Sequence, residues 1–518
     1  MAFDGMSGMT VRQLWEERAQ LFPDKEFLVF RSRAGSELRF TYAEYDRHIN
    51  RVANFFLDLG VQKGDTVAVH LCNSVEFMAC LFGLAKIGGI MVPINEQNLQ
   101  RESEYVLERI MPRAVVTEEA FLPMYQAIQE QRPELVEHLL MARTDEEVPG
   151  TRNLRREVML RDPVLRERRD LLDTDTVQVM YTSGTTSIPK GVEMTHANLV
   201  FAGQYTQWQV SLRDDDIFLT TMPACHSNFQ LAAMMPVIWT GATLVMTEKY
   251  SASRFMDQVR EYGATVVQMV AMMVHTLMLQ PERSNDAEHK LREVMYFLNI
   301  DTAEKEAFER RYGVRLMNSY GSTESIGWVI TDYPSGKRKW PSVGRVGLGY
   351  QVKIADDRGY EQPTGVMGEI LIRGQIGRSV MKGYYRDELN TRRTIDSNGW
   401  MHTGDKAYMD EEGFIFFVDR KSNMIKRAGE NISTTEIEEV LMHDDRISEA
   451  AVIGVPDPIR DQAVKAFVVP SEGVELSEAD VIALCERELA AFKVPSYVEI
   501  RTSLPHTTSM KVEKKLLS

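Results

Sequence analysis

Hydrophobic and polar residues follow two alternating patterns along most of the chain. Short runs rich in Val and Ile, such as residues 65–71 (DTVAVHL) and 264–270 (ATVVQMV), are typical of buried strands. Longer stretches with a helical spacing of apolar residues lie between such runs, as at 74–87 (SVEFMACLFGLAKI) and 251–263 (SASRFMDQVREYG). Because strands and helices alternate, the pattern predicts an α/β fold with layered, largely parallel sheets.

The pattern changes around residues 340–420. Short strands such as 369–374 (EILIRG) are separated there by Gly, Asn and Asp turns, which indicates a smaller β-rich subdomain resembling a distorted barrel. After Arg420 the order of elements is αββαβ, in a unit of about 100 residues, the size of a small domain. We therefore expect a large N-terminal domain over 1–420 and a small α+β domain over 421–518.

The charge balance favours an enzyme that acts on small molecules. The 518 residues carry a formal net charge of −15, and the sequence shows no basic stripe of the kind that binds nucleic acid. Four cysteines, Cys72, Cys80, Cys225 and Cys485, lack CxxC spacing, so neither a zinc site nor a disulfide framework is expected.

The chain start and the longest apolar stretch argue against secretion and membrane insertion. The first residues lack the basic region and apolar core of a signal peptide. Residues 77–94 are almost long enough to span a bilayer, but they contain Lys86, a Gly88–Gly89 break and Pro93. We expect a buried helix and a buried strand there, a cytoplasmic location and no integral membrane association.

Residues 181–192 (YTSGTTSIPKGV) have the composition of a phosphate-binding loop. The flanking segments, 176–181 and 191–196, read as strands, so the loop is expected to be a turn between strands whose N–H groups can face an anion. Gly184 allows close approach of a ligand to the backbone. The hydroxyls of the loop can donate to phosphate oxygens, and Lys190 adds a positive charge.

This loop differs from the P-loop of kinases and GTPases. In that pattern the lysine follows the second glycine and the loop opens a helix, whereas here Lys190 precedes Gly191 and follows Pro189. An ordinary polar hairpin is the alternative, because Ser, Thr and Gly are common turn residues. The other motifs of the chain decide between the two interpretations.

Six motifs in order give the chain a resemblance to the adenylate-forming superfamily of acyl-CoA synthetases, adenylation domains and luciferases. They are YTSGTTSIPKGV, MPACH, NSYGSTES, GWMHTGD, FVDRKSNMIKRAGENIS and SMKVEKKLL. The resemblance covers nearly the whole chain. Within the superfamily the chain is most similar to the carnitine/crotonobetaine-type CoA ligases, in SLRDDDIFLT, EKYSA, LREVMYFLN and GVRLMNSYG.

The resemblance implies two half-reactions that require ATP, Mg²⁺ and, in the second step, CoA. A carboxylate attacks the α-phosphate of ATP, releases pyrophosphate and forms an acyl-adenylate. The CoA thiol then displaces AMP. A carboxylate oxygen is a poor leaving group and AMP is a good one, so adenylation activates a small acid for transfer; positioning and electrostatic stabilisation in a dry site make the displacement feasible.

The resemblance also implies which residues contact ATP. The loop would hold the β- and γ-phosphates and later the pyrophosphate, Tyr320 would stack on adenine, and Asp405 and Arg420 would bind the ribose. The full set is Thr182, Ser183, Gly184, Thr185, Thr186, Lys190, Asn318, Tyr320, Thr323, Asp405 and Arg420.

Four residues receive catalytic roles from the resemblance. Thr323 would contact the α-phosphate, Glu324 would hold Mg²⁺, Lys511 would neutralise charge in the first transition state, and His226 would gate entry of the acid. Three of them have a plainer alternative: Glu324 as an acid at a helix start, His226 as a packed core histidine and Lys511 as a solvated lysine in a basic tail.

The acyl pocket would be lined by His226, Trp208, Ser319, Gly321, Ser322 and Trp328. A quaternary ammonium substrate such as carnitine requires an aromatic cage or a buried acid. Trp208, Tyr205 and Trp328 are candidates for such a cage, and packing in the core is the alternative for each of them. A short polar or aromatic acid fits the sequence equally well.

The small domain is expected to be a mobile lid. The resemblance places the hinge at Ser422, where Asp or Lys is more usual, and brings Lys426, Gly429 and Asn431 to the thiol channel after rotation. The chain departs from the family pattern at Met510, which stands where glycine is usual, and at RDQA, residues 460–463. Ser322 and MYFLN, residues 295–299, are further departures.

Two alternatives to an acid–CoA ligase stay open. Some superfamily relatives pass the adenylate to an amine or activate nitrite for diazotisation of an aryl amine, and the motifs exclude neither. A non-catalytic ATP-binding protein is disfavoured by the presence of Glu324, Asp405, Arg420 and Lys511. A homodimer is expected only because it is the commonest closed assembly.

Overall fold

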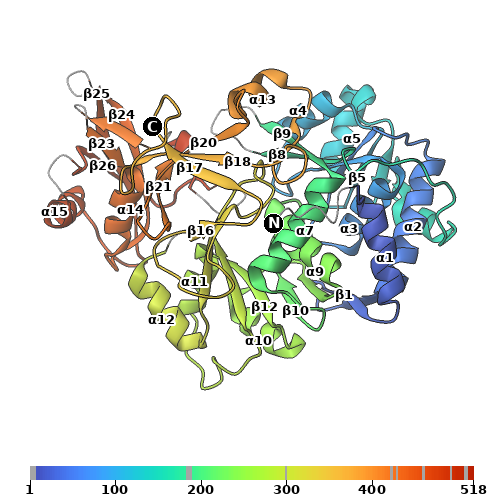
Figure 1. Ribbon diagram of the computed structural model, residues 1–518, viewed down its shortest axis with the longest axis horizontal. Coiled ribbons are helices and arrows are strands. Elements are labelled where there is room, and N and C mark those ends of the chain that lie inside the picture. The colour runs from blue at the N-terminus through green and yellow to red at the C-terminus, as the bar shows by residue number, and fades with distance from the viewer. Residues whose placement is uncertain are drawn as a thin grey trace. The chain divides into compact units, whose positions relative to one another are not determined.

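The computed structural model describes residues 8–182, 189–297, 300–420, 424–427, 430–457, 461–489, 493–506 and 512–517. The chain forms two compact units, coloured along the chain in Figure 1. The first consists of Met1–Gln351 and Ile372–Met401, and the second of Val352–Leu371 and His402–Ser518. Both mix helices and strands, which confirms the predicted α/β class. The domain boundary expected after Arg420 stays a prediction.

A nine-stranded sheet runs through the first unit, and its order is β16-β15-β14-β13-β12-β10-β11-β1-β2. The six strands from β14 to β1 in this order pair in parallel. Parallel strands that are covered on both faces have largely apolar sequences, and β12 is an example. The strands are β1 (Glu26–Arg31), β2 (Glu37–Thr41), β10 (Ile217–Thr220), β11 (Thr243–Thr247), β12 (Val266–Val270), β13 (Glu293–Phe297), β14 (Leu316–Tyr320), β15 (Ile330–Thr331) and β16 (Arg345–Val346).

A second sheet of eight strands has the order β19-β9-β8-β4-β3-β5-β6-β7. Its middle strands are parallel, whereas β8 and β9 form an antiparallel pair that β19 extends. The strands are β3 (Thr66–His70), β4 (Ile90–Pro93), β5 (Ala114–Thr117), β6 (Leu139–Met141), β7 (Arg152–Asn153), β8 (Thr176–Thr182), β9 (Lys190–Thr195) and β19 (Gly383–Tyr384).

Helices surround these sheets in the first unit (Figure 1). They are α1 (Val11–Leu21), α2 (Tyr42–Asp58), α3 (Val75–Ile87), α4 (Gln100–Ile110), α5 (Leu122–Gln131), α6 (Leu154–Met159), α7 (His196–Val210), α8 (Ser227–Phe229), α9 (Met235–Thr240), α10 (Ala252–Tyr262), α11 (Ala271–Met278), α12 (Thr302–Tyr312) and α13 (Glu388–Thr394).

The longest apolar stretch is the buried helix α3 followed by the buried strand β4, as predicted. The Ser74 hydroxyl caps the helix start by accepting from the N–H of Phe77. Gly88 ends the helix in the left-handed conformation (φ 81°), which glycine adopts without steric cost. Lys86 is buried in this helix and donates to Asp46 and Asn50, so its charge is paired within the core.

A four-stranded sheet occupies the predicted β-rich region. Its order is β17-β18-β20-β21, and the described residues do not pair its two end strands with each other, so the sheet is open. The strands are β17 (Gln351–Ala355), β18 (Gly368–Arg373), β20 (Trp400–Met409) and β21 (Ile415–Arg420).

The final hundred residues contain the predicted αββαβ elements preceded by a short hairpin. Their core is a cluster of apolar side chains from the sheet and both helices, including Ile437, Val464 and Val481. The elements are β22 (Met424–Arg427), β23 (Glu430–Ser433), α14 (Thr434–Met442), β24 (Ile447–Asp457), β25 (Asp461–Pro470), α15 (Glu478–Glu488) and β26 (Tyr497–Ile500).

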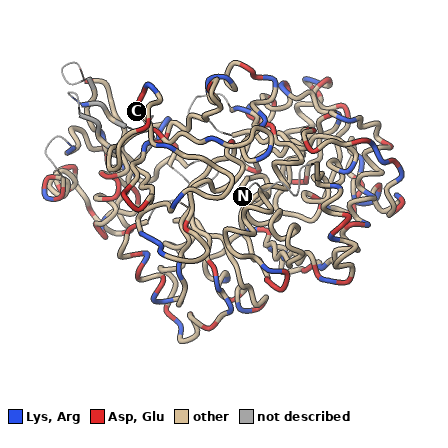
Figure 2. Tube along the Cα trace, viewed as in Figure 1, with Lys and Arg blue, Asp and Glu red and all other residues tan. Residues whose placement is uncertain are grey.

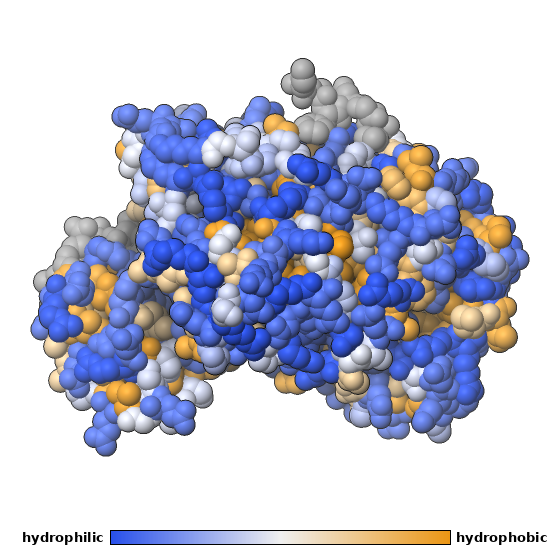
Figure 3. Space-filling view, turned by 90° about the horizontal axis from the view of Figure 1, so that it is seen from below, coloured by the Kyte–Doolittle hydropathy of each residue, from blue (hydrophilic) through white to orange (hydrophobic). Residues whose placement is uncertain are grey.

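Positive and negative residues are interspersed along the chain (Figure 2). The face in Figure 3 is mainly hydrophilic, with scattered hydrophobic residues. Over the described ranges, helices with the length and apolar character needed to cross a membrane are absent.

Candidate active site

The carboxyl ends of parallel strands bring several predicted site residues to one edge of the nine-stranded sheet. The segment MPACH follows β10, Phe297 ends β13, and Tyr320 ends β14. Because neighbouring parallel strands end at the same edge of a sheet, the loops that follow them converge there. Open α/β sheets bind their ligands at this edge.

The predicted phosphate loop connects two antiparallel strands, as the sequence indicated. Thr182 of β8 pairs with Lys190 of β9 at the open end of this hairpin. The residues between them that were assigned to phosphate binding, Ser183, Gly184, Thr185 and Thr186, lie outside the described residues. The two flanking strands are confirmed, and the contacts with phosphate stay predictions.

The Lys190 side chain lies against the ring of Tyr384, a residue that was not predicted to belong to the site. Tyr384 of β19 pairs with Val192 of β9, and the Lys190 ammonium nitrogen is 5.0 Å from the centre of the Tyr384 ring. A cation at this distance is attracted by the negative face of the ring. Tyr384 is 7% exposed, so the ring is a fixed surface for the lysine.

Glu324 is held by the same tyrosine. The Tyr384 hydroxyl donates to Oε1 of Glu324 over 3.0 Å, and the Met381 N–H donates to the Glu324 carbonyl over 2.8 Å. Burial, with a smaller contribution from the Glu324 charge, raises the pKa of Tyr384 well above its usual value. The phenol therefore keeps its proton at neutral pH and acts as a donor to the carboxylate.

The donor set around Glu324 fits a cation that is bound mainly by a nucleotide. Across the described residues, clusters of three or more acidic, His or Cys side chains that could hold a metal are absent. Mg²⁺ retains several waters and is commonly held by one or two carboxylates together with substrate phosphates. Glu324 is partly exposed and offers one such carboxylate. The residues present thus fit Mg²⁺ that arrives with ATP.

Thr323 and His226 lie close together, because Thr323 contacts the residue that follows His226. The Thr323 hydroxyl donates to the Ser227 hydroxyl over 3.4 Å, and Ser227 directly follows His226. On the other side, Nδ2 of Asn95 is 3.4 Å from Nε2 of His226. The structure therefore brings His226, Thr323 and Glu324 into one region, next to the Tyr384 and Lys190 pair.

The backbone before His226 is fixed by buried side chains. Asn73 accepts from the Ala224 N–H over 2.6 Å and donates to the Met222 carbonyl over 2.9 Å. Gln230 donates to the Ala224 carbonyl over 2.9 Å and begins a single π-helical turn, Gln230–Met234. Such turns are frequent at functional sites. The position of His226 is therefore set by the fold.

Burial lowers the pKa of His226 below its usual value. The imidazole is therefore neutral at physiological pH and can accept as well as donate a hydrogen bond. A neutral ring beside the predicted acyl pocket avoids an ion pair that would trap a substrate carboxylate.

The side chains of Asn318 and Ser319 form hydrogen bonds with other buried residues. Asn318 is fully buried and donates to the Ser342 carbonyl over 3.0 Å. The Ser319 hydroxyl is 3.0 Å from that of Thr331 and accepts from Gln209 over 2.8 Å. These contacts occupy the side chains in a buried network, and their predicted contacts with ATP and substrate stay predictions.

The tight turn after β14 requires glycine at position 321. A Cβ on Gly321 would lie 2.3 Å from the Gly327 carbonyl oxygen, closer than any packed pair of atoms allows. Ile326 in the same turn adopts a positive φ of 63°, a strained conformation for a β-branched residue. Tyr320 is half-buried at the start of this turn and Ser322 is exposed.

The predicted aromatic residues form two different environments. Trp328 stacks on Phe297 with ring centres 3.9 Å apart and planes at 21°, and the Tyr205 hydroxyl donates to its carbonyl over 2.5 Å. Trp208 instead contacts the rings of Tyr205 and Tyr333. Phe297, which was not assigned in the sequence analysis, thus joins Trp328 at the carboxyl edge of the sheet, whereas Tyr205 is a buried packing residue.

In the second unit, the two residues predicted to bind ribose are register partners on neighbouring strands. Asp405 of β20 pairs with Arg420 of β21 in the antiparallel register. The Asp405 N–H donates to the Thr403 hydroxyl over 3.1 Å, and the Gly404 N–H donates to the Glu369 carboxylate over 3.0 Å. The part of β20 that carries Asp405 is therefore held by hydrogen bonds from neighbouring residues.

Two of the residues assigned to the second step, Lys426 and Asn431, belong to the paired strands β22 and β23, and their roles stay predictions. The register of these strands places Lys426 opposite Asn431. Gly429, the hinge residue Ser422 and the catalytic candidate Lys511 lie outside the described residues, so their roles stay predictions.

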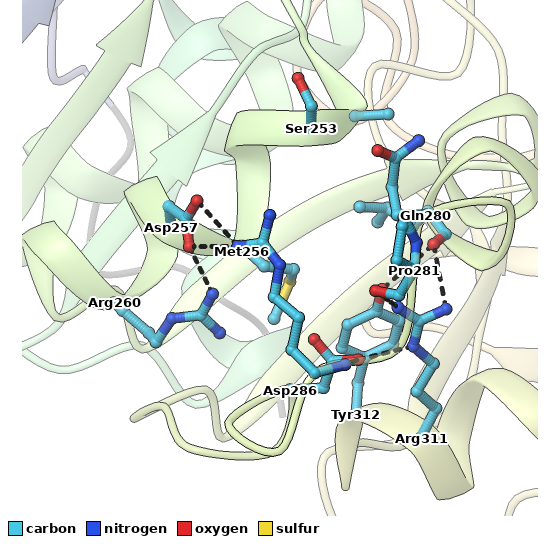
Figure 4. A pocket seen from close by; sticks show the side chains of 12 residues that line it. Ser253, Met256, Asp257, Arg260, Gln280, Pro281, Asp286, Arg311 and Tyr312 are labelled. Carbon is cyan, nitrogen blue, oxygen red and sulfur yellow. Dashed lines mark hydrogen bonds and ion pairs between the residues drawn. The ribbon is translucent and has the colours of Figure 1, made fainter.

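A separate group of charges in the first unit is structural. Asp286 pairs with Arg311 over 2.7 Å, and Asp257 pairs with Arg260 over 2.6 Å and with Arg283 over 3.1 Å. Figure 4 shows Asp257, Arg260, Asp286 and Arg311 around a cavity of about 20 Å³, which is about the space that one water needs. This volume is far below the roughly 300–1,000 Å³ of pockets that hold small-molecule ligands, so the cavity is too small to be a substrate site.

Comparison with known proteins gives matches over the whole chain. The profile described as AMP-binding enzyme matches residues 15–385, and that described as AMP-binding enzyme C-terminal domain matches residues 436–511. A crotonobetaine/carnitine–CoA ligase of Salmonella paratyphi B is 46% identical over 517 residues, which cover 99% of this chain and 100% of the relative.

Solved structures also match nearly the whole chain. ATP-bound MatB from Rhodopseudomonas palustris superposes with a TM-score of 0.87 at 25% identity and covers 98% of both chains. The o-succinylbenzoate CoA synthetase MenE from Bacillus subtilis, in complex with its acyl-adenylate intermediate, gives a TM-score of 0.86 at 25% identity and covers 99% of both chains.

Proposed function

We propose, because this chain belongs to the AMP-binding enzyme family, that it is an AMP-forming ligase that joins a small acid to CoA in two steps. The observation that carries the proposal is the convergence of Lys190, Glu324, Thr323 and His226 in one region of the first unit, in a chain that aligns with acid–CoA ligases from end to end.

In the first step, a carboxylate oxygen of the acid bonds to the α-phosphorus of ATP and the bond to the leaving pyrophosphate breaks. Two anions must approach each other, so the site must supply positive charge and hydrogen-bond donors. Lys190 and the Thr323 hydroxyl would supply them from the first unit, and Lys511 would add a charge. Mg²⁺, when bound at Glu324, would neutralise part of the triphosphate charge.

In the second step, the CoA sulfur bonds to the acyl carbon and the bond to AMP breaks. The thiol proton leaves to solvent or to a basic group, and AMP departs as the stable anion. Asp405 and Arg420 would hold the AMP ribose in both steps, because neither step changes the ribose. Lys426, Gly429 and Asn431 would lie near the thiol in the second step only.

We further propose that the acid carries a quaternary ammonium group, as crotonobetaine and carnitine do. The supporting observations are the 46% identity to the crotonobetaine/carnitine–CoA ligase and the stacked Trp328–Phe297 pair at the carboxyl edge of the sheet. A rigid indole is the aromatic surface that attracts such cations most strongly. Desolvated cation–π contacts contribute about 2 kcal/mol, which corresponds to roughly 30-fold in affinity.

The substrate class is tested with acid-dependent exchange of labelled pyrophosphate into ATP. We expect kcat/KM for crotonobetaine to exceed that for the uncharged analogue crotonate by at least about 10-fold. Trp328→Leu should reduce this ratio, whereas Trp239→Leu, on α9 where the ring lies under Arg18, should preserve it. Equal exchange with both acids in the wild-type enzyme would contradict the quaternary ammonium assignment while leaving adenylation intact.

A cytoplasmic location and a homodimeric state are further parts of this proposal. They are supported by the sequence composition and by the frequency of twofold assemblies. Size-exclusion chromatography with light scattering measures the second directly.

A further inference from the structure

Tyr384 contacts both Lys190, which is assigned to the phosphates, and Glu324, which is assigned to their Mg²⁺. Its hydroxyl donates to Oε1 of Glu324 over 3.0 Å, and its ring carries the Lys190 ammonium 5.0 Å from the ring centre. Lys190 belongs to β9 and Glu324 to the turn after β14, so the tyrosine joins segments that are distant in the sequence.

The tyrosine is itself fixed from several sides. Its N–H donates to the Thr391 hydroxyl over 2.8 Å, and Thr391 donates in turn to the Asp387 carbonyl over 2.9 Å. Pairing of β19 with β9 sets the backbone. A side chain that is 7% exposed and held in this way has little rotational freedom.

Lys190 and Glu324 make no ion pair with each other in the part of the chain that the structure describes. A direct pair would neutralise both groups before the nucleotide arrived, and the nucleotide would have to break it. Tyr384 instead interacts with each group separately. Its hydroxyl donates one hydrogen bond to the Glu324 carboxylate, and its ring face attracts the Lys190 ammonium without using any of the three N–H donors.

We propose that Tyr384 is a positioning residue that separates and orients Lys190 and Glu324, so that the ammonium is available to the phosphates and the carboxylate to their Mg²⁺. This inference deepens the proposed function and rests on the assignment of Glu324 to the cation. The tyrosine acts through these two residues and makes no contact with reacting atoms.

The neighbouring Tyr385 provides a matched control. Successive residues of a strand point to opposite faces, and Tyr385 packs against the apolar cluster of the eight-stranded sheet. The Arg386 guanidinium lies over the Tyr385 ring, 4.9 Å from the ring centre. Tyr385→Phe therefore removes the same phenol oxygen one position along the chain and leaves Glu324 untouched.

The test is equilibrium binding of ATP, measured by calorimetry at a series of Mg²⁺ concentrations, without acid or CoA. We expect Tyr384→Phe to raise the Mg²⁺ concentration for half-maximal binding by about 10-fold, because a hydrogen bond to a charged group is lost. Tyr384→Leu should also weaken ATP binding at saturating Mg²⁺, since Lys190 loses its ring. Tyr385→Phe should match the wild type.

The Glu324→Gln variant distinguishes an error in the role of Tyr384 from an error in the assignment of Glu324 to Mg²⁺. If Glu324→Gln raises the Mg²⁺ requirement and Tyr384→Phe does not, the positioning role is overturned and the cation site stands. If neither variant changes it, both are overturned. An equal loss of ATP binding at all Mg²⁺ concentrations in Tyr384→Phe would identify a merely structural role. In the double variant, effects smaller than the sum of the single effects would support direct coupling through the hydrogen bond.

Discussion

Lys511→Ala is expected to lower the rate of adenylate formation by about 10²–10³-fold, the usual cost of removing one group that stabilises transition-state charge. The assigned role of the lysine is to neutralise charge that develops as the carboxylate meets the α-phosphate. The second half-reaction develops its charge at the acyl carbon and the departing AMP. A chemically supplied acyl-adenylate should therefore still react with CoA at a rate close to that of the wild type.

The two half-reactions are measured separately, by pyrophosphate exchange and by acyl-CoA formation from the synthetic adenylate. Lys515→Ala is the matched control, because Lys515 is an exposed lysine of the same basic tail; both rates should be preserved in it. An equal loss of both half-reactions in Lys511→Ala would refute a role confined to the first step.

Asp405→Ala is expected to impair both half-reactions, in contrast to Lys511→Ala. The carboxylate would accept from both ribose hydroxyls, and each hydrogen bond to a charged group contributes about 1.5–3 kcal/mol. Loss of both should reduce kcat/KM for ATP by about 10²-fold or more. Because AMP keeps its ribose, consumption of the supplied adenylate should fall as well.

Asp357→Ala controls for the loss of a negative charge in the same unit. Asp357 has a side chain that is 75% exposed and lies 3.6 Å from Lys406, and exposed pairs of this kind contribute little to stability. Its ATP kinetics should equal those of the wild type. Normal use of the supplied adenylate by Asp405→Ala would contradict the ribose assignment.

The fold followed from the sequence where one physical signal was sufficient. Buried parallel strands require continuous apolar runs, and β3, β5 and β12 lie where those runs are. The β22–β23 hairpin was not predicted as strands, because it is rich in charged residues and its register with β25 is a long-range pairing. The sequence over residues 477–493 (SEADVIALCERELAAFK) predicts one helix, whereas α15 ends at Glu488. The prediction extends too far because alanine is compatible with a helix and gives no stop signal.

The candidate site was predictable only in part. Motif resemblance identified Glu324 and Lys190, but it gave no indication that Tyr384 joins them, because that contact spans 60 residues from Glu324 and depends on the pairing of β19 with β9. Phe297 was missed for a similar reason, since its stacking on Trp328 needs the order of the sheet. Asn318 and Ser319 were grouped with ligand contacts because a motif does not distinguish buried side chains from open ones.

The central claim is that ATP is cleaved to AMP and pyrophosphate to activate an acid for CoA. Product analysis with ATP, Mg²⁺ and crotonobetaine, with and without CoA, tests it most directly when a parallel reaction contains nitrite and an aryl amine. We expect AMP, pyrophosphate and acyl-CoA in the reaction with acid and CoA. ADP as the product would contradict adenylation itself, and AMP formed only with nitrite would contradict the acid–CoA ligase.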